Sequence, residues 1–176
     1  MRLSFLTGCL LIYQVLLGQT GSTDTSFKKN SVFVEVFGHN RGLFSVNYER
    51  LFRLTGDFIV YSARTGVGYT PGMDIKDKHL GGSIYLPIVF SVLAGNKAHY
   101  AQLGASYTVA FGHDFIDSTT YPPTVYQKFE SAYIISLGYR YMRRGFMAQL
   151  FPLLQWTNNP SSKFTVGFGL SIGSVF

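Results

Sequence analysis

The sequence predicts an all-β fold, an eight-stranded antiparallel up-and-down transmembrane β-barrel made from one domain. Large apolar residues alternate with small or polar ones through most of the 176-residue chain, which is typical of strands with two different faces. Charged residues make up only 14% of the chain, against about 25% in an ordinary soluble domain. No internal stretch is apolar for the roughly 18 residues that a membrane helix needs, so strands have to carry the apolar surface.

The first four period-2 segments are separated by turn signals. They are SVFVEVFG (31–38), LFSVNYERLF (43–52), FIVYSARTGVGY (58–69) and GSIYLPIVFSV (82–92). In the first, the valines lie on one face, opposite Phe33, Glu35 and Phe37. In the second and third, large apolar residues lie opposite small or polar ones such as Ser45. The fourth contains Pro87, which is unfavourable inside a central strand and predicts a weak point or a bulge.

The last four segments show the same alternation. They are HYAQLGASYTVAFG (99–112), AYIISLGYRYM (132–142), GFMAQLFPLLQW (145–156) and FTVGFGLSIGSVF (164–176). Gln102, Gly138 and Gln149 lie on the polar face, and the final segment places glycine and serine opposite Phe, Val, Leu and Ile. Most segments are near the 9–11 residues with which a tilted strand crosses a bilayer.

The connections alternate in length. Those after the second, fourth and sixth segments are short (RLTGD, AGNKA and RRG), whereas residues 70–81 and 113–130 form longer ones. The first and last connections, HNR and TNNPSS, are tight. Short turns on one side and longer loops on the other are typical of outer-membrane barrels with both termini in the periplasm.

The apolar face is expected to point outward to lipid. The opposite face is mostly Gly, Ser and Thr, whereas a solvated face would carry Lys and Glu along every strand. Eight strands enclose a space that side chains just fill, and about thirty large apolar groups would not fit there. A soluble lipocalin-like carrier, with its apolar face inward, is therefore the less favoured alternative. Tyrosines near strand ends predict interfacial girdles: Tyr48, Tyr69, Tyr107, Tyr133 and Tyr141.

Four charged residues interrupt the polar face, and this register points all of them into the lumen. They are Glu35, Glu49, Arg64 and Arg140. Two acids and two bases balance, and unpaired charges there would be costly. We interpret them as a paired polar network that packs the lumen rather than as an ion or proton path.

The N-terminus has the pattern of a signal peptide, predicted over residues 1–19. Arg2 is followed by an apolar run over 3–17 and then by small, polar residues. Cys9 fits a lipoprotein cleavage pattern, but the apolar run before it is too short, so we place it in the signal core. Residues 20–30 are expected to be a flexible leader and 31–176 the barrel, without cysteine in the mature chain.

The net charge of +6 and a pI near 9.5 raise the possibility of nucleic-acid binding. The basic residues are scattered, however, and several fall at turns, as do Arg53, Lys97, Arg143 and Arg144. This distribution indicates charges near lipid headgroups, and no nucleic acid is expected as a partner.

No catalytic, cofactor or metal site is predicted. His39, His79 and His113 fall in expected outer loops, and His99 falls near a periplasmic turn. Some eight-stranded barrels are lipid A deacylases or acyltransferases that use Ser, His and an acid. His113 and Asp114, with Ser131, are the nearest approach to that set, without a recognisable motif. A metal site at Asp74, Asp77 and His79 is equally weak.

The long segment 113–130 is the best candidate for interaction with a partner. Its aromatic residues include Phe115, Tyr121 and Tyr126, beside a stiff Pro-Pro pair. Exposed aromatics on a rigid support suit adhesion or binding. The alternative is that these rings pack on the barrel rim.

Several stretches, taken in order, resemble a family of small, mostly uncharacterised outer-membrane β-barrel proteins of Gram-negative bacteria. They are VEVFGHNRGLFSVNYERLF, ARTGVGY, YLPIVFSVLAGNKAHYAQLGAS, LGYRYMRRGFMAQLFPLL and GFGLSIGSVF. The last stretch also resembles the signal that the barrel-assembly machinery reads, with Phe168, Leu170, Ile172 and Phe176 matching it and Ser174 departing from it. The resemblance implies architecture and location but no reaction.

We therefore expect a monomeric barrel in the outer membrane, surrounded by its lipid and lipopolysaccharide. Its role would be structural, or binding through the outer loops, without catalysis and without a cofactor. A lipid-modifying enzyme or a narrow, porin-like pore are the alternatives.

Overall fold

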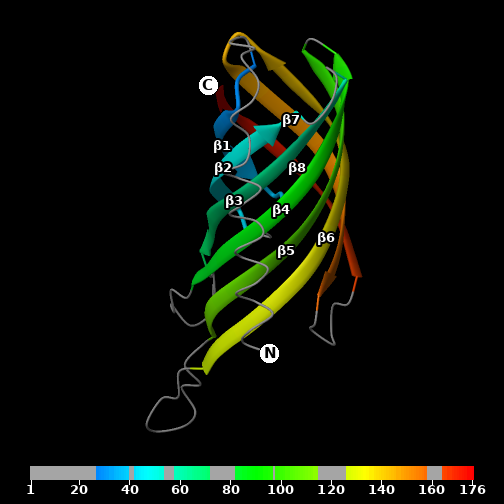
Figure 1. Cartoon of the computed structure of the whole chain (residues 1–176). Coiled ribbons are helices and arrows are strands. Elements are labelled where there is room, and N and C mark those ends of the chain that lie inside the picture. Colours follow the sequence, from blue (N-terminus) through cyan, green and yellow to red (C-terminus); the bar gives the residue numbers. More distant parts are fainter. Residues whose placement is uncertain are drawn as a thin grey trace, which may run out of the picture.

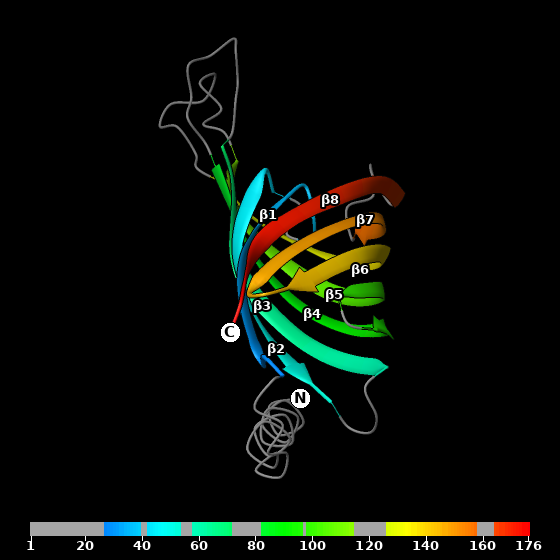
Figure 2. The same cartoon turned by 90° about the horizontal axis from the view of Figure 1, so that it is seen from above.

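The computed structural model describes residues 27–39, 42–53, 58–71, 82–96, 98–114, 126–157 and 164–176. They form β1 (Asn30–Val36), β2 (Phe44–Phe52), β3 (Ile59–Pro71), β4 (Gly82–Asn96), β5 (His99–Asp114), β6 (Tyr126–Arg143), β7 (Phe146–Thr157) and β8 (Phe164–Val175). Each strand pairs antiparallel with the next, and β8 pairs with β1 to close the sheet (Figures 1 and 2). The predicted eight-stranded antiparallel barrel is confirmed.

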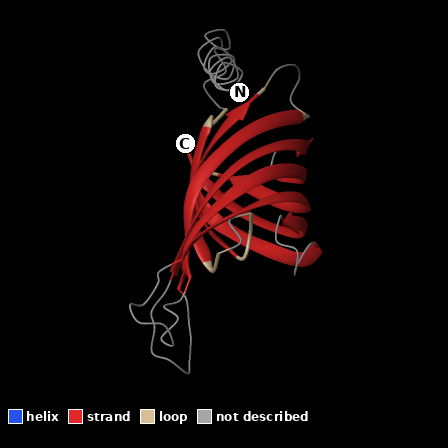
Figure 3. Ribbon diagram, turned by 90° about the horizontal axis from the view of Figure 1, so that it is seen from below, coloured by secondary structure: helices blue, strands red, loops and turns tan. Residues whose placement is uncertain are grey.

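The described residues are almost entirely strand (Figure 3). Within them there is no helix with the length and apolar character needed to cross a membrane. Alternation explains the strands: in β2, Phe44 and Val46 are exposed, whereas Ser45, Asn47 and Glu49 are buried. A shift of one residue in register would exchange these two faces, so the pattern fixes the register strongly.

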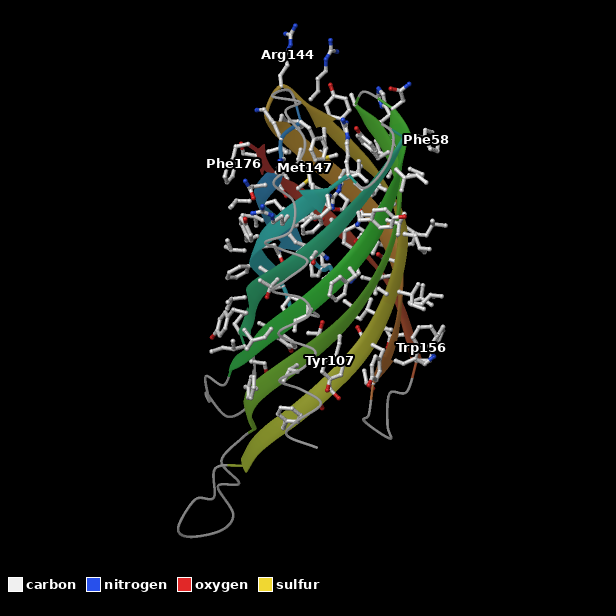
Figure 4. All side chains as sticks on the ribbon, in the orientation of Figure 1. Phe58, Tyr107, Arg144, Met147, Trp156 and Phe176 are labelled. Atoms are coloured by element: carbon white, nitrogen blue, oxygen red, sulfur yellow. The ribbon has the colours of Figure 1, made fainter. Side chains whose placement is uncertain are left out.

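The two ends of the barrel differ in their connections. We call the end with the β2–β3, β4–β5 and β6–β7 connections the hairpin end, and the opposite end the loop end. Asn30 and Phe176 exchange two backbone hydrogen bonds of 2.9 and 2.8 Å at the hairpin end. Figure 4 shows Arg144 and Phe176 at this end and Trp156 toward the other.

Strands β5 and β6 extend further toward the loop end than predicted. They continue to Asp114 and begin at Tyr126, so the segment predicted as a loop over 113–130 is shortened at both sides. Phe111 lies opposite Phe129 in the added ladder, with ring centroids 5.5 Å apart. This aromatic pair supports the start of the extension.

Pro87 does not cause a bulge, which corrects that part of the prediction. The β3–β4 register is the same on both sides of Pro87, and only two ladder pairs there are missing. Pro152 of β7 interrupts its ladder with β6 in the same way, again without a change of register. Each proline lacks an N–H, so it weakens the pairing with one neighbour while the other neighbour holds the strand in place.

Residues 27–29 pack against the hairpin end before β1 begins. Phe27 contacts the apolar cluster described below, and the Arg53 guanidinium carbon lies 4.1 Å from the centre of its ring. The amide of Leu51 donates to the carbonyl of Lys29 at 2.7 Å. Residues 27–29 of the leader predicted over 20–30 therefore lie against the barrel, and residues 20–26 lie outside the described residues. The predicted signal peptide lies outside the described residues.

The interior is layered, and it is not lined by small polar residues throughout as predicted. Charged side chains occupy the middle, between two apolar clusters. The cluster at the hairpin end contains Phe33, Leu51, Val60, Leu93, Tyr100, Met147 and Val175. The cluster toward the loop end contains Ala132, Ile134, Phe151 and Leu153. Large side chains are needed at these inward positions because small ones alone would leave the lumen empty.

Truncation of Leu93 to alanine tests the hairpin-end cluster. Leu93 is fully buried, so Leu93→Ala should lower the free energy of unfolding by about 2–5 kcal/mol. The measurement is urea unfolding of the refolded barrel, followed by the mobility of unboiled samples on a gel. Leu103→Ala on the outer face, where Leu103 is 55% exposed, is the control and should change stability much less. Equal losses in both variants would contradict a packed interior.

Candidate functional site

The four predicted charges lie in the lumen and form two ion pairs. Arg64 Nη1 lies 2.7 Å from Glu35 Oε2. Arg140 binds Glu49 with both terminal nitrogens, Nη1 to Oε2 at 2.6 Å and Nη2 to Oε1 at 3.0 Å. All four side chains are at most 1% exposed. The bidentate geometry of the Arg140–Glu49 pair is the strongest that a guanidinium and a carboxylate make.

The Arg140–Glu49 pair crosses the lumen, because Glu49 lies on β2 and Arg140 on β6. Ser31 of β1 donates to Glu49 Oε2 at 3.0 Å, and Arg140 Nη2 also donates to Gln149 Oε1 at 2.9 Å. The pair therefore connects strands that are not neighbours in the sheet. Burial of two charges is expensive, and these added hydrogen bonds offset part of that cost.

Glu35 accepts hydrogen bonds from three parts of the chain. Besides Arg64, it accepts the backbone N–H of His39 at 2.7 Å through Oε1 and the hydroxyl of Ser171 at 3.3 Å through Oε2. The Arg64 guanidinium carbon lies 5.3 Å from the centre of the Phe33 ring, within the range of a cation–π contact. Glu35 thus links the charged layer to the β1–β2 connection.

His39 corrects the prediction that it lies in an outer loop. It is fully buried, and it contacts strands far away in the sequence. Its Nδ1 lies 2.8 Å from the hydroxyl of Ser106, and its Nε2 lies 2.9 Å from the hydroxyl of Ser136. The Thr108 hydroxyl donates to the His39 carbonyl at 2.6 Å, and the Phe151 ring lies 5.1 Å from the imidazole. The first part of the β1–β2 connection, at Gly38 and His39, therefore lies in the lumen, and His39 contacts the opposite wall.

Local backbone geometry explains the inward turn. Phe37 has φ of 56°, a left-handed conformation that is uncommon for a residue with a large side chain. Gly38 follows, and a Cβ at this position would overlap the Glu35 carboxylate. The sequence contains only a weak signal for this turn, the glycine before the histidine. Nothing local shows that the connection folds inward rather than outward.

The serine and histidine contacts do not form a nucleophile with its base and orienting acid. In such a triad the carboxylate holds one imidazole nitrogen, whereas here serine hydroxyls occupy both. Glu35 binds the backbone of His39 instead of its ring. Full burial also separates this imidazole from any substrate, so its contacts hold the turn in place.

The residues considered for a lipid-modifying site are not brought together. His113 lies opposite Gln127 in the β5–β6 ladder, whereas Ser131 lies opposite Val109. Four ladder positions separate them, about 13 Å along the sheet. His99 begins β5 at the hairpin end, and its Nδ1 bonds the hydroxyl of Tyr139.

The residues considered for a metal site and for loop interaction lie partly outside the described residues. Asp74, Asp77 and His79 lie outside the described residues, and within the described ranges no three His, Cys, Asp or Glu residues gather as metal ligands. Of the loop aromatics, Phe115 and Tyr121 also lie outside. Tyr126 is the first residue of β6, opposite Asp114.

The four residues compared with an assembly signal lie along and after β8. Phe168, Leu170 and Ile172 point outward and are 71%, 55% and 56% exposed, and Phe176 follows the strand. Ser174, which departs from the signal, donates its hydroxyl to the carbonyl of Gly145 at 3.0 Å. The serine thus ties β8 to the β6–β7 hairpin.

Comparison with known proteins gives little beyond the fold. A scan against protein-family descriptions finds no match. A search of curated proteins also finds no match. Among solved structures, the chain is similar to the crystal structure of the N-terminal β-barrel domain of Pseudomonas aeruginosa OprF, with 15% sequence identity and a TM-score of 0.49. That similarity covers 85% of this chain and 100% of the other. The residues of this chain therefore have to carry any functional proposal.

Removal of one partner tests the cross-lumen pair. Arg140→Ala leaves the buried Glu49 carboxylate without its cation, and should lower the free energy of unfolding by about 3–5 kcal/mol. The double variant Glu49→Gln with Arg140→Met removes both charges and should recover most of that loss. Urea titration of the folded barrel measures both. Arg143→Ala, at the exposed hairpin end, is the control and should stay within about 0.5 kcal/mol of the parent. A double variant as unstable as Arg140→Ala would contradict the importance of pairing.

Proposed function

We propose that this chain is an integral outer-membrane β-barrel protein with a closed lumen. Its role is structural, or binding at its two ends, rather than catalysis. The observation that carries this proposal is the outer surface of the barrel, where large apolar side chains are exposed on every strand.

The apolar surface runs around the whole barrel. Exposed residues on successive strands are Val34, Val46, Val67, Ile88, Leu103, Leu137, Leu150 and Leu170, each at least 44% exposed. The largest apolar patch on a soluble monomer is usually a few hundred Å². A continuous band of this kind requires lipid or a partner around it, and a closed barrel leaves no unpaired strand edge in that lipid.

Aromatic side chains gather toward both ends of the band. Toward the loop end they form cross-strand pairs: Phe44 with Tyr69, Tyr107 with Tyr133, and Trp156 with Phe164, with centroids 5.1–6.3 Å apart. In Figure 4, Tyr107 and Trp156 lie toward that end. Toward the hairpin end, Tyr141 contacts His99 and Phe146. Two aromatic belts at the ends of an apolar band are typical of membrane interfaces.

The height of the band fits a bilayer. Outward-facing positions of β6 from Phe129 to Tyr141 are apolar or aromatic apart from Ser131, which is about 40 Å of strand. At the usual tilt of about 40° this spans about 30 Å along the barrel axis, close to the thickness of the hydrocarbon layer.

In this proposal the hairpin end faces the periplasm and the loop end faces the exterior. The barrel is a monomer, lipid and lipopolysaccharide surround it, and the barrel-assembly machinery reads its last strand. The paired charges favour a closed lumen, because a narrow pore would require the Arg140–Glu49 pair to separate.

Cell fractionation with gel mobility tests the location. The protein should be found in the outer-membrane fraction, and unboiled samples should migrate apart from boiled ones because the folded barrel resists denaturation by detergent. A soluble protein with unchanged mobility would overturn the outward assignment of the apolar face.

Arginine substitutions at two depths test the membrane contact. Leu137 and Phe58 are 63% and 61% exposed, but Leu137 lies near the middle of β6. Phe58 lies at the hairpin end (Figure 4). Leu137→Arg should destabilise the barrel in lipid vesicles by about 2–4 kcal/mol, and Phe58→Arg by at most about 1 kcal/mol. Equal effects would argue against a bilayer around this surface.

Planar-bilayer recording tests the closed lumen. The purified parent protein should give no steady single-channel conductance, because its charged layer and apolar clusters fill the interior. Steady conductance that changes in Arg64→Gln would instead establish the narrow pore.

A further inference from the structure

A pocket of about 380 Å³ opens at the hairpin end of the barrel. Its described lining is Phe27, Lys28, Leu51, Arg53, Tyr100, Met142, Arg143, Arg144, Gly145 and Val175. The apolar cluster of the hairpin end forms its floor and separates it from the charged layer below. The pocket plays no part in the proposed closure of the lumen.

The walls carry four cations. Lys28 donates from Nζ to the carbonyl of Val175 at 3.0 Å, and the Arg53 guanidinium stacks over Phe27. Arg143 and Arg144 are exposed at the tip of the β6–β7 hairpin. The described lining contains neither Asp nor Glu, so the formal charges of this lining are all positive. A concave site with charges of one sign concentrates the opposite ion.

The backbone at Arg144 shows how the rim of the pocket is built. Arg144 and Gly145 have φ of 52° and 90°, and together they form the two-residue turn between β6 and β7. Such turns favour Asn-Gly, because both central residues are left-handed. Arginine is a poor choice for the geometry of this turn, whereas its guanidinium adds charge at the rim of the pocket.

The apolar part of the lining lies inside the mouth of the barrel. Leu51, Tyr100 and Val175 are at most 5% exposed and belong to the interior cluster, not to the outer face. The acyl chains of a lipid would contact the outer face, so they would not reach these side chains. The pocket therefore suits an apolar group that comes from water with an anion beside it.

We infer that this pocket binds an acidic peptide segment of a water-soluble partner, with carboxylates at the rim and an apolar side chain inside. Arginine binds carboxylates with two parallel hydrogen bonds, which favours its use at such sites. Arginine, tyrosine, methionine and phenylalanine are the residues enriched where proteins bind one another. The volume, near the lower end of the range for ligand sites, admits one or two side chains. This inference does not depend on the membrane proposal, because the pocket can be tested in detergent.

Fluorescence anisotropy on the full chain, refolded in a neutral maltoside detergent, tests the inference. The probe is an eight-residue peptide of alternating glutamate and leucine with a neutral fluorophore at its N-terminus. Binding should saturate and weaken as salt rises. A peptide with glutamine in place of glutamate should bind at least about tenfold more weakly. Equal binding of both peptides would overturn the inference, because it would show apolar adsorption.

Arg144→Asn separates binding from folding. It should improve the turn and leave the barrel at least as stable to urea, while it weakens the acidic peptide severalfold. Arg50→Gln is the matched control. Arg50 lies on β2 near the hairpin end but does not line the pocket, so this variant should bind the acidic peptide as the parent does. Unchanged affinity in Arg144→Asn would overturn the inference. Displacement of the peptide by inorganic phosphate at constant ionic strength would also overturn it, in favour of a phosphate site.

Discussion

The narrow lumen of an eight-stranded barrel is the constraint on which the rest of this structure depends. Side chains from all eight strands meet there, so each inward position has to be filled and each charge has to be paired. The Arg140–Glu49 pair satisfies both requirements at once, because its long side chains reach across the lumen from β6 to β2. Around it the chain places apolar clusters above and below, which keep water from the charges. A low local dielectric strengthens correctly paired charges and penalises any that lose their partner.

The β1–β2 connection depends on the same constraint. β1 and β2 have only 7 and 9 residues, whereas β6 has 18, so the wall is short on one side. His39 folds inward from these short strands and fills space between the charged layer and the loop-end cluster. Its backbone binds Glu35 and its ring binds Ser106 and Ser136 on the facing wall. The turn is therefore part of the packed interior, and its strained backbone at Phe37 is held by those contacts.

The charges of this protein are divided between two environments with different consequences. Two acids and two bases cancel inside the lumen, so residues outside that layer carry the whole net charge of +6. Part of this excess gathers at the hairpin end, where Lys28, Arg53, Arg143 and Arg144 surround an apolar pocket. Inside, opposite charges hold strands together; at the mouth, the charges of the described pocket lining are all positive. The lumen charges, the charged mouth and the apolar outer band all depend on the same strand register, because the register decides which face each residue occupies.

The sequence by itself determined the number of strands, the order of pairing and the face on which most strand residues lie. Phe37 is an exception: alternation grouped it with Phe33 and Glu35, but it is exposed because its left-handed backbone ends the alternation after β1. Period-2 alternation is a local property, so it could be recognised without knowledge of the fold. It also indicated that Glu35, Glu49, Arg64 and Arg140 point inward. Only the tertiary structure decided which acid pairs with which base: Glu49 lies opposite Arg64 in the ladder, yet it binds Arg140 across the lumen.

Three other features could be recognised only in the closed barrel. They are the inward turn at His39, the large apolar side chains at both ends of the lumen and the pocket at the hairpin end. Each joins residues from strands that are distant in the sequence, as His39 joins Ser106 and Ser136. Alternation assigns a residue to a face, but it does not say how deep in the barrel that residue lies or what it meets there. Closure of the sheet alone brings these side chains together, because it fixes the distance between opposite walls.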